Sequence, residues 1–185
     1  KSVNGLLPER PVIREQLWQA PDNAILWVEL ALQQIISGAA ESAARSMRTA
    51  LQLAPDNRHV LRSAARLFSH VHEPDIGYHF LKKSSATEYD PWLMSAEIAM
   101  ATRIDRRPSL LRKGLSVLEG AEGQPRLELS ELAGAAATTY LDGSVSKRAK
   151  RLFVQSLATP TDSAIAQAEW ASQATGERFL EAQRL

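Results

Sequence analysis

Apolar residues recur along the chain in pairs of short stripes with polar turns between them. Between residues 24 and 57, apolar side chains stand at 27, 30 and 31 and again at 43, 47 and 50. Spacings of three and four residues place each set on one face of a helix. Gly38 lies between the two stripes and suits a turn, and Pro55 ends the second stripe because proline cannot continue a helix. The pattern predicts two antiparallel helices joined by a short turn.

The same arrangement returns every 34 residues. Pro21-Asp22-Asn23 recurs 34 residues later as Pro55-Asp56-Asn57, and Pro91 and Pro125 have the same separation. The spacing predicts units at 24–57, 58–91 and 92–125, a longer fourth unit at 126–162, and partial units at 8–20 and 163–185. Repeats of this length are typical of arrays in which each unit packs on its neighbours. We therefore expect one helical-repeat domain over residues 1–185, as a part of a longer protein.

Composition agrees with an all-α fold. The chain contains 28 Ala and 24 Leu against 8 Val and 8 Ile, so helix formers far outnumber the β-branched residues that strands favour. With 44% hydrophobic residues, 23% charged residues and a net charge of +1, the chain is of the folded rather than the disordered class. Cysteine is absent, which excludes disulfides and thiolate metal sites. This composition leaves the compartment open, and a cytoplasmic location is the default expectation.

The first unit resembles the tetratricopeptide repeat. Counted from Ala24, the matching residues are Trp27, Leu30 and Ala31 at positions 4, 7 and 8, and Ala43, Met47, Ala50 and Pro55 at positions 20, 24, 27 and 32. Small residues at facing positions let two helices approach closely, while large ones fill the wider gaps. The resemblance is carried mainly by residues 21–91 and is extended to 125 and then to 176. It implies a right-handed α-solenoid of antiparallel helix pairs, with about four full units and half-units at the ends.

The resemblance also implies a function and a binding surface. Proteins of this family are interaction scaffolds or adaptors that help to assemble complexes, and the first helix of each unit lines a concave groove. The residues at groove positions that we assign to partner binding are Ile25, Val28, Leu32, His59, Arg62, Arg66, His70, Met100 and Arg103. An apolar first unit beside a basic second unit suits a protein segment that is both acidic and hydrophobic.

Two alternatives to these assignments stay open. The aliphatic residues of the first unit could be covered by a neighbouring segment of the chain or by another domain, because exposed aliphatic stripes are uncommon. Arg62 and Arg66 could belong to a solvated helix face. One version of the family grips the carboxylate of chaperone tails, but Val28, Leu32, Leu93 and Glu97 stand where its Lys, Asn and Arg residues would be. We therefore do not expect chaperone-tail binding.

No residue pattern predicts catalysis, a cofactor or a metal. His70, His72, Glu73, Asp75 and His79 lie close together in the sequence, yet their spacing in an expected turn is not a metal-binding signature. No nucleophile or phosphate-loop motif is present. We also expect no carboxylate to be embedded in an apolar run as a perturbed general acid would be. The sequence therefore predicts a protein that is not an enzyme and has no small-molecule substrate.

Two basic clusters raise a different possibility. The clusters are Arg103, Arg106, Arg107, Arg112 and Lys113, and Lys147, Arg148, Lys150 and Arg151. Neither contains an interleaved aromatic residue on which bases could stack, so solvated turns and helix faces are the expected reading and nucleic-acid binding is not expected. The alternative function is a regulatory or nucleic-acid-sensing repeat module of a larger enzyme, with its catalytic domain outside this chain.

Overall fold

The computed structural model describes residues 10–121, 127–140, 147 and 151–152 of the chain. Over these residues the protein is all-α, as predicted, and contains no strand. The helices are α1 (Arg10–Gln19), α2 (Ala24–Ile36), α3 (Ala40–Leu53), α4 (Arg58–His70), α5 (Pro74–Lys83), α6 (Pro91–Arg103), α7 (Leu111–Gly120) and α8 (Leu127–Thr138), with a short 3-10 helix η1 (Ser85–Glu88) before α6. None of the described helices is long and apolar enough to cross a membrane.

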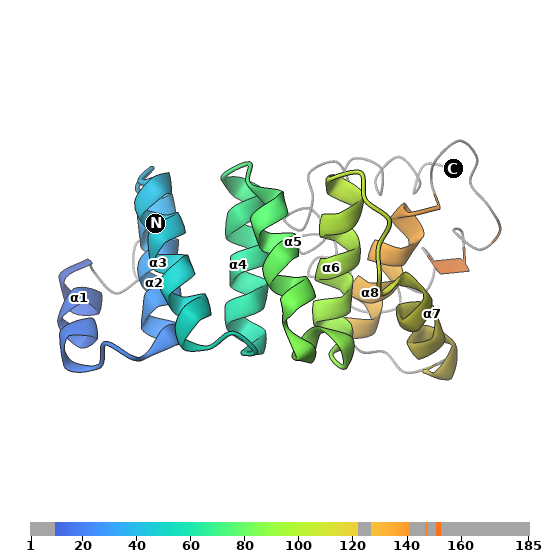
Figure 1. Cartoon of the computed structure of the whole chain (residues 1–185), viewed down its shortest axis with the longest axis horizontal. Helices are drawn as coiled ribbons and strands as arrows, with labels where there is room; N and C mark the ends of the chain where they lie inside the picture. The colour runs from blue at the N-terminus through green and yellow to red at the C-terminus, as the bar shows by residue number, and fades with distance from the viewer. Residues whose placement is uncertain (1–9, 122–126, 141–146, 148–150, 153–185) are drawn as a thin grey trace, which may run out of the picture.

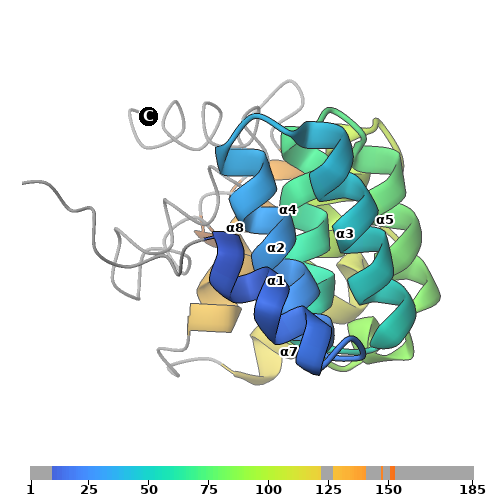
Figure 2. The same cartoon turned by 90° about the vertical axis from the view of Figure 1, so that its left-hand side faces the viewer.

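The helices follow one another in sequence order along the long axis of the molecule, from α1 at one end to α7 and α8 at the other (Figure 1). Helices α2, α4, α6 and α8 contact one another in succession, and α3 and α5 each pack between two of them. Viewed along the row, α3 and α5 lie to one side of α2 and α4 (Figure 2). The described part of the chain therefore has one layer made of α2, α4, α6 and α8, with the alternate helices beside it.

The recurring Pro-Asp-Asn motif marks the beginnings of helices. The side chains of Asn23 and Asn57 accept hydrogen bonds from the backbone N–H groups of the second residues of α2 and α4, at 3.0 and 2.9 Å. Asp90 does the same for α6, at 2.8 Å. These side chains satisfy backbone donors that have no partner inside the helix. The 34-residue repeat is therefore, at this point, a repeat of the capping residue.

The turns inside successive units also share a backbone feature. Gly38, between α2 and α3, has φ +78°, and His72, which stands 34 residues later between α4 and α5, has φ 60°. This left-handed conformation carries no steric cost for glycine and is uncommon for other residues. The turn expected at Gly38 is confirmed. His72 occupies the same place in the next turn despite the strain that its side chain adds.

Alanine residues carry the close approach of α2 to α3. Ala31, Ala43 and Ala50 are fully buried, and Met47 is almost so. Because protein interiors are packed to the density of organic crystals, a larger side chain at such a place has no room without movement of its neighbours. The small residues named in the first unit are thus the ones that set the distance between its two helices.

Overpacking this contact should destabilise the protein. We expect Ala43→Leu to lower the free energy of unfolding by about 1–3 kcal/mol, the usual cost of forcing extra methylenes into a packed core. Urea denaturation followed by circular dichroism measures the change. Ala40→Leu, at an exposed position of the same helix, is the matched control and should leave stability nearly unchanged. An Ala43→Leu protein as stable as the parent would show that the α2–α3 contact is looser than its burial indicates.

One expectation about carboxylates is wrong. Glu97 lies in the apolar stretch of α6 and is completely buried. Its carboxylate accepts hydrogen bonds from the backbone N–H and the hydroxyl of Ser109, at 3.0 and 2.7 Å, and from the N–H of Leu110 at 3.3 Å. These groups lie immediately before α7, which has no capping side chain of its own. Glu97 therefore ties the start of α7 to the middle of α6.

Candidate partner-binding cleft

A cleft of about 630 Å³ lies between α2 and α4. It is lined by Val28, Glu29, Leu32, Ile35, Ile36, Met47, His59, Ser63, Arg66, Leu67 and His70. Helix α2 supplies most of the aliphatic side chains, and α4 supplies the histidines and the arginine. Six of the nine residues that the repeat pattern assigned to partner binding either line the cleft or, in the case of Ile25, lie on the helix that forms its apolar wall. Whether a partner binds them stays a prediction.

The apolar wall combines buried and exposed side chains. Val28 is buried among the core residues, whereas Leu32 and Ile36, which follow at intervals of four residues along α2, are 38% and 63% exposed. Residues four apart share one face of a helix, so the three form a continuous stripe that emerges toward the end of α2. Large aliphatic side chains left exposed side by side are a common mark of an interaction surface.

The opposite wall is basic. His59, Arg66 and His70 are exposed on one face of α4, and Glu29 of α2 is the carboxylate among the lining residues. Partial burial of the His70 imidazole lowers its pKa below the usual value, and the neighbouring charges of Arg66, Arg103 and His72 lower it further. Positive charge is therefore concentrated at the end of the cleft that lies near His70.

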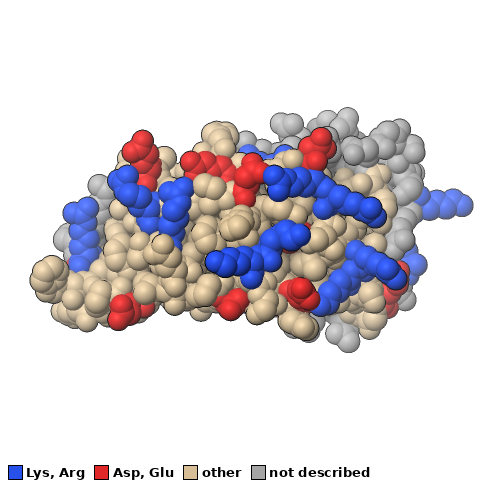
Figure 3. Space-filling view, viewed as in Figure 1, with Lys and Arg blue, Asp and Glu red and all other residues tan. Residues whose placement is uncertain are grey.

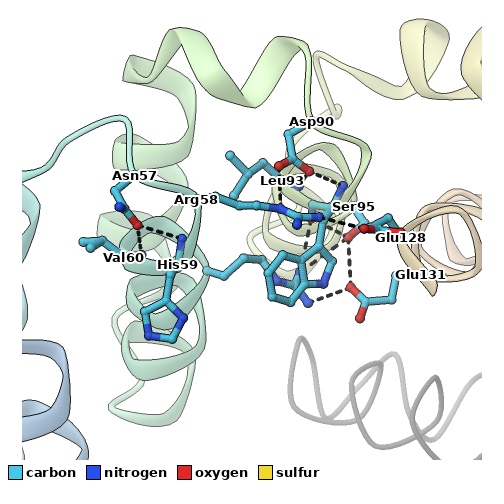
Figure 4. A network of polar contacts seen from close by, with 11 residues as sticks. Asn57, Arg58, His59, Val60, Asp90, Leu93, Ser95, Glu128 and Glu131 are labelled. Atoms are coloured by element: carbon cyan, nitrogen blue, oxygen red, sulfur yellow. Dashed lines mark hydrogen bonds and ion pairs between the residues drawn. The ribbon is translucent and has the colours of Figure 1, made fainter. Parts of the chain in front are cut away.

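Arg62 does not line this cleft, and the expectation that it is an exposed groove residue is wrong. Its side chain is 4% exposed and pairs at 2.6 Å with Glu131 of α8, which is 5% exposed (Figure 4). The guanidinium also donates to the backbone oxygen of Trp92 at 3.3 Å. Because α6 packs closely on α8, Glu131 reaches across α6 to α4. The carboxylate of this chain thus occupies the place that had been assigned to a partner.

A network of charges surrounds this pair. Arg58 contacts Asp90 at 2.6 Å and Glu128 at 3.2 Å, and the guanidinium carbons of Arg58 and Arg62 lie 4.5 and 4.4 Å from the ring centre of Trp92. Burial lowers the pKa of Arg62 to about 10 and raises the pKa of Glu131 to about 7, although each charge opposes that shift in the other. The network joins α4, α6 and α8, and its central pair is a structural feature rather than an open site.

Two further residues assigned to partner binding are positioned differently from the expectation. Met100 is buried in the core, where its sulfur lies 3.6 Å from the hydroxyl of Ser69. A partner in the groove could not touch it without displacing α4 or α5, so this assignment is wrong. Arg103 is half-buried and donates to the Ser69 hydroxyl at 2.9 Å. Its charge reaches His70, but its guanidinium is held by the fold.

The first basic cluster is paired in part with acidic residues. Arg106 lies 3.5 Å from Asp75, and Lys113 lies 3.5 Å from Glu88. Figure 3 shows basic and acidic side chains interspersed over this face of the molecule. Of the second cluster, Lys147 and Arg151 are described and exposed, whereas Arg148 and Lys150 lie outside the described residues. The described arrangement gives no continuous basic track of the kind that phosphate backbones require.

The histidine-rich turn places no metal-binding group. Among the described residues, no three His, Cys, Asp or Glu side chains lie where they could hold a metal ion together. Within the turn, Glu73 pairs with Arg48 at 3.3 Å and Asp75 with Arg106.

The chain was compared with family models, with curated proteins and with solved structures. None of the three comparisons gave a match. The residue pattern and the cleft geometry are therefore the grounds on which a function can be argued.

Proposed function

We propose that this chain is a tetratricopeptide-type, right-handed α-solenoid that acts as a protein-interaction scaffold. It holds an acidic and aliphatic segment of another protein in the cleft between α2 and α4. The observation that carries the proposal is the pairing of two unlike walls: exposed aliphatic side chains of α2 face the basic side of α4 across an open cleft. Such a site recognises a segment by burial on one side and by charge on the other.

The aliphatic wall gains from being covered. Leu32 and Ile36 keep a large part of their surface in water, and each Å² of apolar surface removed from water contributes about 25 cal/mol. Burial of this stripe, together with the matching side chains of the partner, supplies affinity without requiring a particular sequence. It favours leucine, isoleucine, valine or aromatic residues along one edge of the partner segment.

The basic wall supplies selection. His59, Arg66 and His70 favour carboxylates on the edge of the partner that faces α4, and they disfavour segments rich in lysine or arginine. Charge complementarity of this kind acts on the association rate and on the choice of partner more than on affinity itself. The partner segment should therefore alternate aliphatic and acidic residues so that the two kinds face opposite walls.

The helix arrangement supports the solenoid part of the proposal. Each described pair of a repeat, α2 with α3, α4 with α5 and α6 with α7, begins near the first residue expected from the 34-residue spacing. The first helices contact one another in order, and three of them begin at an Asn or Asp cap. In such arrays each unit packs mainly against its neighbours, and the first helices form the concave surface.

Variants on the two walls test the proposal. A peptide selected from a random library displayed on phage, with the purified protein as bait, serves as the ligand, and fluorescence anisotropy measures its affinity. We expect Ile36→Glu and Arg66→Glu each to weaken binding by more than tenfold, because one buries a charge against the partner and the other repels its carboxylates. Both side chains are exposed, so the melting temperature should change little.

Matched controls lie on α3, away from the cleft. Leu53→Glu and Arg45→Glu make the same changes at exposed positions and should leave peptide affinity unchanged. If folded Ile36→Glu and Arg66→Glu proteins bind the peptide as the parent does, the partner does not use this cleft. Failure of the library to yield any peptide that competes at the cleft would contradict the scaffold function itself, and a cleft occupied by a second copy would show as a dimer in light scattering.

A further inference from the structure

Two histidines and one arginine share the basic wall of the cleft. His59, Arg66 and His70 stand on one face of α4, and a separation of 11 residues along a helix corresponds to about 16 Å. Histidine is the side chain whose charge ordinarily changes between pH 5 and 8. The charge of this wall is therefore set partly by pH, whereas that of a wall built from arginine or lysine alone would not be.

The surroundings of His70 oppose its protonation when the cleft is empty. Arg66 precedes it by one helical turn on α4, Arg103 approaches from α6, and His72 lies in the following turn. Helix α2 presents Glu29 to the cleft, and α3 presents the apolar Met47. Three cationic or potentially cationic groups and partial burial outweigh this carboxylate, since the pKa of His70 is lowered.

We propose that the cleft binds its acidic partner segment together with a proton on His70, so that the segment is held more tightly as pH falls from 8 to 6. This inference rests on the proposed function, because it concerns the regulation of the same cleft. A carboxylate of the partner beside His70 and Arg66 supplies the negative charge that the empty cleft lacks. The protonated imidazole then donates to that carboxylate instead of adding to an uncompensated cluster of cations.

The direction of the pH dependence follows from linkage. A group whose pKa is higher in the complex than in the free protein takes up a proton on binding, so affinity is greatest below both pKa values and falls as pH rises through the pKa of the complex. Each unit of pKa difference is worth at most a tenfold change in affinity. Carboxylates and guanidinium groups ordinarily keep their charge between pH 6 and 8, which leaves the histidines as the groups that titrate.

The experiment uses the phage-selected peptide as probe, together with a second peptide in which every Asp and Glu is replaced by Asn or Gln. Isothermal titration calorimetry at pH 6, 7 and 8, in two buffers of different ionisation enthalpy, gives the affinity and the number of protons taken up. We expect the acidic peptide to bind about three- to tenfold more tightly at pH 6 than at pH 8, with net proton uptake. The neutral peptide should show neither effect.

Two histidine variants assign the proton to its site. His70→Gln should remove most of the pH dependence, whereas His79→Gln, at an exposed position of α5 outside the cleft lining, should retain it. The imidazole Cε1–H signal of His70, followed by NMR in the parent protein, should titrate at higher pH with the acidic peptide bound than without it. That measurement needs no variant and so stands even where a substitution disturbs folding.

The outcomes separate this inference from the function on which it rests. A peptide that binds the cleft equally at pH 6 and pH 8 without proton uptake would overturn the proton linkage and leave the scaffold function intact. A pH dependence that survives His70→Gln and disappears in His79→Gln would overturn the assignment to His70. Absence of binding at every pH would overturn both proposals.

Discussion

Replacing Glu131 by alanine is expected to lower the free energy of unfolding by about 3–5 kcal/mol at pH 8. Removal of one member of a buried ion pair leaves the other charge without compensation in a medium of low dielectric constant, which is the usual cause of losses of this size. Arg62 is the charge left behind, and at 4% exposure it has little access to water. Measurement at pH 8 is above the pKa of Glu131, which is about 7. Urea denaturation followed by circular dichroism gives the change.

Three further proteins separate this ion pair from its setting. Glu131→Gln keeps the shape and an acceptor oxygen, so its cost should be smaller than that of alanine. The double variant Arg62→Met/Glu131→Leu removes both charges and should recover much of the lost stability, since a buried pair is often replaceable by apolar residues. Glu41→Ala breaks the exposed pair with Arg45 and should have almost no effect. If Glu131→Ala were no more costly than Glu41→Ala, the pair would be open to solvent in solution.

The helical fold could be predicted from sequence because its signals are local. The stripe of Trp27, Leu30 and Ala31 identifies a helix within two turns of chain, and the spacing of prolines identifies where helices stop. The Asn and Asp caps lie beside those prolines and act within three residues. Each of these features depends on neighbours in the sequence, which is why the pattern remained legible without knowledge of tertiary contacts.

The fate of Arg62 depends on a residue 69 positions away. Arg66 and Arg62 occupy equivalent faces of α4 one turn apart, yet Arg66 lines the cleft and Arg62 is buried under α8. Nothing in the local pattern distinguishes them, because the difference comes from how closely α8 approaches α6. The same limit applies to Met100, whose groove position lies where neighbouring helices close over the surface.

The cleft itself was predictable on one wall and partly on the other. Leu32 belongs to an aliphatic stripe that helix geometry alone places on a single face, and the structure leaves the end of this stripe exposed. The basic wall was expected at the next helix, and His59, Arg66 and His70 lie there. What the sequence could not provide was the width of the gap between α2 and α4, which depends on the packing of α3 beneath them.

Glu97 shows how a buried carboxylate can be overlooked, because a single acidic residue in the apolar stretch of α6 resembles a position on a solvated helix face. The structure places its carboxylate against the segment before α7, where it accepts from the N–H and hydroxyl of Ser109 and the N–H of Leu110. A hydrogen bond to a charged acceptor contributes about 1.5–3 kcal/mol, and a buried donor left without a partner costs about 1–3 kcal/mol. Loss of this carboxylate should therefore release the start of α7.

Glu97→Ala is accordingly expected to lower the free energy of unfolding by about 3 kcal/mol or more, with the loss concentrated at the α6–α7 junction. Hydrogen exchange should show faster exchange of the Ser109 and Leu110 amides, while α2 and α3 keep their protection, because local opening reports the stability of each segment separately. Glu97→Gln retains one acceptor oxygen and should lose less. Glu119→Ala, at an exposed position of α7, changes the same residue type without touching the junction. Unchanged exchange at Ser109 and Leu110 in Glu97→Ala would mean that water or another group caps α7 equally well.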